Sequence, residues 1–131
     1  MVSPGRDAIY ARLNELGLAA KDGLTVVPNF LGERHNESLR GAISGIDLNN
    51  FDLGRLSRGL AKGIMESLKQ MLPEAVFRHR TGIAASGNAL RQNRLLVEVA
   101  EEVFQLPVRM CDRPEEAACG AAILAAPHPR A

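Results

Sequence analysis

Apolar residues recur at every third or fourth position in the middle of the chain, which is the spacing of one helix face. The pattern starts at Leu53 and stops at Pro73, which cannot continue a helix. It predicts a helix over residues 53–72 whose apolar stripe consists of Leu56, Leu60, Ile64, Leu68, Met71 and Leu72.

The same predicted helix contains Gly54, Gly59 and Gly63. Each glycine in a helix interior costs about 1 kcal/mol relative to alanine. Gly59 and Gly63 are one helical turn apart and therefore share a face. We expect another segment to pack closely against that face and compensate for the cost.

Weaker patterns predict the other elements. Ser3 and Pro4 are typical of a helix start, and apolar residues then recur until Gly17, which predicts a helix over 4–16. Asn93 is expected to cap a helix, and Pro114 with two following glutamates opens a last one. The runs rich in β-branched or apolar residues predict strands at 24–27, 40–46, 81–85 and 106–110.

Strands that alternate with helices favour a layered α/β domain with parallel strands. A length of 131 residues, 46% of them hydrophobic, suits one domain with one core over residues 1–131. Within it, residues 1–23 are a predicted N-terminal helix and linker, and residues 127–131 a frayed tail.

Composition excludes several classes of partner. Sixteen basic and fifteen acidic residues leave a net charge of +1, so no overall field favours nucleic acid or a membrane surface. No apolar run approaches the roughly 20 residues of a membrane span. The three histidines are scattered, so we expect no metal site built by the protein. Cys111 and Cys119 have neither metal-ligand nor disulfide-framework spacing, so we expect two reduced thiols. A cytoplasmic location, which is a reducing compartment, fits best.

The segment Ser86-Gly87-Asn88 follows a predicted strand and precedes a predicted helix. Open α/β sheets bind ligands at this kind of junction, where small residues let the backbone approach a nucleotide. The glycine spacings of dinucleotide-binding and phosphate-binding loops are both absent. A purely structural turn therefore remains an open alternative.

A second candidate is the polar cluster Gly32-Glu33-Arg34-His35 on a predicted loop. A glutamate and an arginine there could bind a sugar, bind a phosphate or pair with each other. We consider Gly32, Glu33 and Arg34 as a substrate or hinge loop, with a solvated ion pair as the alternative.

Several motifs together resemble the C-terminal domain of the FGGY family of carbohydrate kinases. They occur in the family's order over residues 24–126, and they most resemble members that phosphorylate a seven-carbon ketose. The segments are Pro28-Asn29-Phe30-Leu31-Gly32-Glu33-Arg34, Arg58-Gly59, Lys62-Gly63-Ile64, Ser86-Gly87-Asn88-Ala89 and Glu115-Glu116-Ala117-Ala118-Cys119-Gly120-Ala121-Ala122.

The resemblance implies a partial ribonuclease-H-like, or actin-like ATPase, domain with a mixed sheet and helices on both faces. It implies ATP with Mg²⁺ as the cofactor of the complete kinase and an adenosine-binding loop in this chain. That loop would comprise Ser86, Gly87, Asn88, Ala89 and Asn93, and Gly120 on the last helix would form the opposite wall.

The resemblance also implies that essential parts lie upstream. The family's phosphate-binding strands, general-base aspartate and most sugar contacts belong there, so we expect no catalytic residue in this chain. Asp47 and Asp52 are better explained as caps. Two family strands would also be absent, so we expect an open sheet edge and self-association or a partner chain. A non-catalytic domain that binds another protein is the alternative function.

Overall fold

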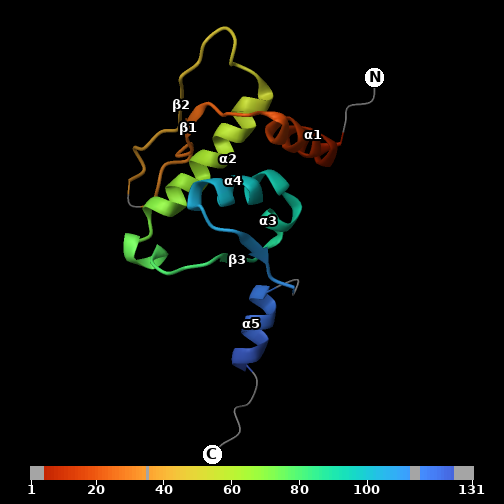
Figure 1. Ribbon diagram of the computed structural model, residues 1–131, viewed down its shortest axis with the longest axis vertical. Helices are drawn as coiled ribbons and strands as arrows, with labels where there is room; N and C mark the ends of the chain where they lie inside the picture. The colour runs from red at the N-terminus through yellow and green to blue at the C-terminus, as the bar shows by residue number, and fades with distance from the viewer. Residues whose placement is uncertain (1–4, 35, 113–115, 126–131) are drawn as a thin grey trace, which may run out of the picture.

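The computed structural model describes residues 5–34, 36–112 and 116–125. Predicted features at Pro114 and in the tail from Pro127 onward lie outside the described residues. Figure 1 shows how the elements are arranged. In chain order they are α1 (Arg6–Ala19), β1 (Thr25–Val27), β2 (Ala42–Ser44), α2 (Leu53–Gln70), the 3₁₀ turn η1 (Glu74–Phe77), β3 (Ile83–Ala85), α3 (Asn88–Gln92), α4 (Arg94–Phe104), β4 (Val108–Met110) and α5 (Glu116–Ala125).

The described strands form two separate two-stranded sheets. β3 and β4 are parallel, as the alternation of strands and helices predicted, with Ile83 opposite Val108. β1 and β2 are antiparallel, with Val26 opposite Ile43, so the expectation of parallel strands is wrong for this pair. The reason is connectivity: β1 and β2 are joined by a loop, whereas parallel strands need a crossover such as a helix.

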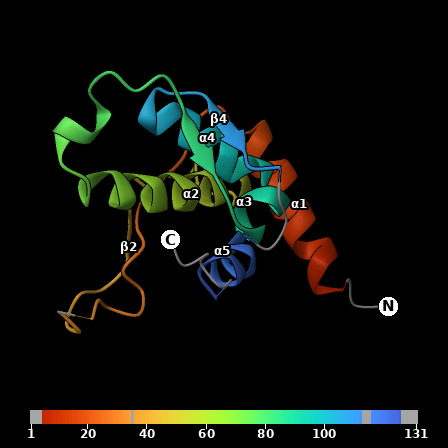
Figure 2. The ribbon, with the colours of Figure 1, turned by 90° about the horizontal axis from the view of Figure 1, so that it is seen from below.

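The glycine face of α2 packs directly on the backbone of β1. A Cβ atom added to Gly59 or Gly63 would lie closer than 3.0 Å to the carbonyl oxygen of Leu24 or Val26, respectively, a separation that real Cβ atoms essentially never show. The predicted close contact is therefore confirmed. Figure 2 shows the result, with α2 between the hairpin of β1 and β2 and the layer that holds α4, β3 and β4.

The core lies on the other side of α2, against α4. It consists of Ala61, Met65, Leu95, Val99 and Ala100, each at most 6% exposed. The predicted apolar stripe of α2 is only partly covered, because Leu60, Ile64 and Leu68 remain 36% to 46% exposed.

The first helix does not end at Gly17 but continues to Ala19. Gly17 is buried, and a Cβ atom there would overlap the side chain of Leu95. This glycine therefore serves close packing of α1 on α4 rather than helix termination, which corrects the predicted boundary.

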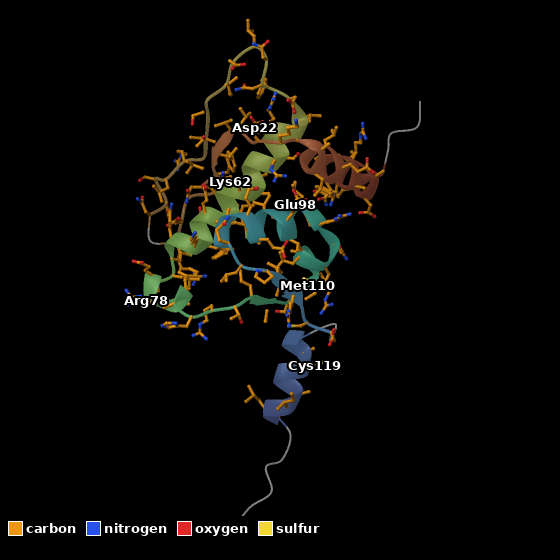
Figure 3. All side chains as sticks on the ribbon, in the orientation of Figure 1. Asp22, Lys62, Arg78, Glu98, Met110 and Cys119 are labelled. Carbon is orange, nitrogen blue, oxygen red and sulfur yellow. The ribbon has the colours of Figure 1, made fainter. Side chains whose placement is uncertain are left out.

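α5 extends away from the body formed by α1, α2 and α4 (Figure 1). Its residues from Ala118 to Ala125 are exposed except for the half-buried Cys119, which Figure 3 labels together with Met110 at the end of β4. None of the helices in the described ranges has both the length and the apolar character needed to cross a bilayer.

Candidate functional site

The turn after β3 requires a glycine. Gly87 has φ 97° and ψ 151°, a backbone region that is essentially restricted to glycine. The strand end beside it is fixed, since the Cys111 N–H donates to the Ala85 carbonyl oxygen at 2.8 Å. The backbone alone thus accounts for Gly87, and a ligand is not needed to explain its presence.

Residues 88–92 form the short helix α3, which the sequence pattern did not predict. Asn93 then caps α4, as predicted, because its Oδ1 accepts the Leu96 N–H at 3.0 Å. Because Asn93 Oδ1 accepts this bond, the Asn93 side-chain nitrogen is the group suited to contact a ligand.

A second asparagine, Asn14 on α1, holds the same helix end. Its Oδ1 accepts the Leu95 N–H at 3.1 Å. The role of Asn14 was not predicted; the one signal in the sequence is that asparagine is a poor residue for a helix interior. The end of the predicted nucleotide loop is therefore positioned by a helix that lies some 80 residues earlier in the chain.

A cavity of about 560 Å³ lies between α1, α2 and the start of α4; we refer to it as the α1 cavity. Two of the predicted nucleotide-binding residues, Ala89 and Asn93, line it together with Gln92. The facing wall includes Tyr10 and Asn14 of α1.

Ser86 faces elsewhere. It lines an apolar cavity of about 580 Å³, the strand cavity, between β3 and the C-terminal part of α2. Among the other residues lining it are Leu68, Leu72, Ile83 and Phe104.

Gly120 is exposed on α5, and a Cβ atom added there would have no neighbour within 4 Å. Gly120 lines neither the α1 cavity nor the strand cavity. Within the described residues, the loop at Ser86–Asn93 and Gly120 are thus not brought together around a common cavity.

The predicted substrate or hinge loop is an ordered turn on the hairpin of β1 and β2. Gly32 has φ 72° and packs on the backbone of Glu37, and the Asn29 Nδ2 donates to Glu33 Oε1 at 2.7 Å. An open cavity of about 650 Å³, the loop cavity, is lined by Gly32, Glu33, Arg34 and Arg40 among others. His35 lies outside the described residues.

A charged cluster joins α2 to α4. Arg58 donates to Glu98 at 2.9 Å and to Glu102 at 2.8 Å, and only 11% of its side chain is exposed. Burial by itself would lower the pKa of Arg58, but its bonds to the two carboxylates outweigh burial and raise that pKa above the usual value. Figure 3 labels Lys62 and Glu98, which lie on the two helices that the cluster connects.

The carboxylates considered from sequence have structural roles. Asp52 Oδ1 accepts the Arg55 N–H at 2.9 Å and caps α2, as predicted. Asp47 Oδ1 accepts the Asn49 N–H at 2.6 Å within the turn that precedes α2, so Asp47 stabilises a turn and caps no helix, which corrects that prediction. Asp22 pairs with Arg55 at 2.8 Å, and this hydrogen bond and charge lower the pKa of Asp22. Within the described ranges, no group of three or more His, Cys, Asp or Glu residues could hold a metal ion.

Known proteins resemble nearly the whole chain. A family model described as "FGGY family of carbohydrate kinases, C-terminal domain" matches residues 5–127. Sedoheptulokinase from Mus musculus is 32% identical over 120 residues, which are 88% of this chain and 25% of the mouse protein. The chain thus spans about a quarter of that relative's length.

Solved structures agree. The crystal structure of xylulose kinase from Bifidobacterium adolescentis has a TM-score of 0.69 at 27% identity, over 90% of this chain and 25% of that one. Plasmodium falciparum glycerol kinase, solved with ADP, has a TM-score of 0.70 at 18% identity, over 87% and 24%, and at that identity the likeness concerns the fold alone. Together these likenesses confirm the resemblance and the predicted fold class, an α/β fold of the actin-like ATPase type.

Proposed function

Because the chain belongs to the FGGY family of carbohydrate kinases, as the match over residues 5–127 shows, we propose that it is the adenosine-binding part of an ATP-dependent sugar kinase. The parent reaction transfers a phosphoryl group from ATP to a ketose such as sedoheptulose, a substrate suggested by the mouse relative. A cytoplasmic location is part of the proposal.

One observation carries the proposal. Ala89 and Asn93, at the two ends of the helical part of the predicted loop, line the same cavity of about 560 Å³. A cavity of this size with apolar walls and a few amide groups is typical of small-molecule sites.

The described residues do not fit the phosphoryl-transfer step itself. That step needs Mg²⁺ and a carboxylate that orients the attacking hydroxyl. Asp22, Asp47 and Asp52 are engaged in pairing, in a turn or in capping, and the acids of the described ranges form no metal-binding group. Among the described residues our proposal includes no catalytic residue, and we derive no step through Mg²⁺. The general base and the sugar contacts belong, in our proposal, to a segment that precedes it.

Titration calorimetry with ATP, ADP and adenosine tests the proposal. Replacement of Gly87 by valine is a poor variant, because φ 97° would strain any β-branched residue. Ala89→Leu is better: Ala89 lies on the helical segment and lines the cavity, and leucine favours helices. We expect nucleotide affinity to fall about tenfold or more, or about 1.4 kcal/mol.

Ala75→Leu, on η1 and also exposed, is the matched control and should leave affinity unchanged. Thermal unfolding of both variants should stay close to that of the wild type. Absence of ATP, ADP and adenosine binding by the wild-type chain would refute the proposed function. Phosphorylation of sedoheptulose only after addition of the remaining part of mouse sedoheptulokinase would support the division of labour.

The alternative, a non-catalytic interaction domain, is favoured by exposed apolar side chains on the hairpin and the loop after it. Leu31 and Leu48 are fully exposed, and Phe30 and Phe51 are more than half exposed. Exposed apolar side chains typically mark an interaction site where another protein can cover them together. Self-association or a partner chain would cover them, and sedimentation together with hydrophobic-dye binding tests this. A monomer that binds little dye and binds ATP would exclude the alternative.

A further inference from the structure

α5 is an apolar helix that is mostly exposed. Its ten residues include one charged residue, Glu116, and are otherwise alanine, glycine, cysteine, isoleucine and leucine. Ile123 is 61% exposed and Leu124 is 82% exposed. No helix or strand of the described residues makes an extensive contact with α5. Because a helix that is apolar on all sides is normally buried, we expect α5 to pack against another surface.

The strand cavity is a surface of matching chemistry. It has a volume of about 580 Å³, and its lining side chains are apolar except for Ser86 and Arg80. Met71 and Leu72, which line it at the end of α2, are 68% and 44% exposed, so the cavity is open to solvent. Within the described residues, β3 pairs with β4 on one edge and with no strand on the other. The chain therefore exposes an apolar cavity as well as an apolar helix.

The orientation of α5 favours a second copy of the chain as the occupant of this cavity. α5 continues beyond the end of β4 and points away from the body of its own chain (Figure 1). No described residue of α5 lines the strand cavity of that chain. A second copy brings both a helix and a cavity, so one partner covers both surfaces in each copy. A partner of another kind would need an apolar helix and an apolar cavity of its own.

We propose that two copies of the chain associate by placing the last turn of α5 of each copy in the strand cavity of the other. An exchange of identical elements about a two-fold axis gives a closed, self-complementary interface. The cavity is large enough for a few aliphatic side chains, and Ile123 and Leu124 supply them. The charged residues of the two surfaces, Glu116 and Arg80, have opposite signs, which favours the encounter. This association goes beyond the proposed function and does not depend on it.

Sedimentation equilibrium over a series of concentrations tests the association and should show monomers and dimers. Leu124→Lys should raise the dissociation constant about tenfold or more, because a charged group is costly to bury in an apolar cavity. Lysine suits the last turn of a helix, so this variant should keep the circular dichroism of the wild type. Leu48→Lys is the matched control, because Leu48 is also exposed but belongs to the loop after β2 and lines no part of the strand cavity. The control should leave the dissociation constant unchanged.

Isotope-filtered NMR on a mixture of ¹³C-labelled and unlabelled copies identifies the occupant. The methyl groups of Leu124 in one copy should lie close to the ring of Phe77 or Phe104 in the other, since both rings line the cavity. The same contacts within a single copy would overturn the inference, because α5 would then fill the cavity of its own chain.

The other outcomes are equally distinct. A monomer at every concentration would overturn the inference. A dimer that Leu48→Lys weakens as much as Leu124→Lys, or more, would also overturn it, since the hairpin region would then form the interface. Calorimetry with ATP reports separately on the proposed function, so a dimer of the expected kind that binds no nucleotide would keep this inference and refute that function.

Discussion

Gly63→Ala should destabilise the chain, although alanine is the better helix former. The added methyl group would meet the Val26 carbonyl oxygen at less than 3.0 Å, well inside the 3.4 Å at which ordinary contact begins. The obstacle is backbone of β1 rather than a side-chain end, so it cannot rotate away. α2 would have to move off β1, or β1 off its partner strand.

The magnitude follows from two opposing terms. Alanine in a helix interior gains about 1 kcal/mol over glycine, whereas overpacking a tight contact costs about 1–3 kcal/mol and occasionally more. Because Val26 is buried and its carbonyl belongs to the sheet, we place the cost at the upper end. The expected net loss is about 1–2 kcal/mol.

Urea unfolding followed by circular dichroism measures this loss as a lower midpoint at unchanged slope. Gly120→Ala on α5 is the matched control, because its methyl group has no neighbour within 4 Å. That variant should gain some of the alanine propensity and lose nothing. A Gly63→Ala chain as stable as the wild type, or more stable, would refute the reasoning that backbone contact explains the glycine.

Two further predictions concern the helix end at the candidate site and the exposed ion pair. Asn14→Leu should lower the unfolding free energy by about 1 kcal/mol, because it removes the acceptor for the Leu95 N–H. Asn14→Asp keeps an acceptor and should retain most of that free energy in the same urea assay. Equal losses in the two variants would show that packing, and not the hydrogen bond, explains the effect. The Arg55 hydrogen bond lowers the pKa of Asp22, so the stability from this pair is present above the ordinary aspartate pKa of 3.8 and is lost as the pH falls through the lower folded-state value. Melting temperatures of the wild type should therefore fall more steeply in acid than those of Asp22→Asn at low salt, and the difference should shrink at high salt; parallel curves would contradict the pairing.

Much of the helical framework could be predicted from local pattern. The apolar spacing from Leu53 and the stop at Pro73 located α2, and the cost of Gly59 and Gly63 correctly indicated a close neighbour. The cap at Asn93 could also be predicted, because capping depends on residues within one helical turn. The existence of these features is a matter of short-range chemistry.

Features that depend on distant segments, and elements too short for a periodic pattern, could not be predicted from the sequence. In the sequence Gly17 has the features of a helix end, but the contact with Leu95 of α4 explains this glycine. α3 is too short to show a periodic pattern. The partial exposure of Leu60 and Ile64 also follows from what the rest of the chain does not cover.

The chain's own pattern of apolar spacing, prolines and asparagine caps was enough to locate the longer helices and the turn at Gly87, because these depend on neighbours within a few residues. The folded arrangement decided which surfaces meet: α1 against α4 through Asn14, the cavity shared by Tyr10 and Ala89, and the separation of Gly120 from the loop cannot be read from spacing. Contacts between residues some 80 positions apart depend on how helices pack in three dimensions, and no local pattern encodes that geometry.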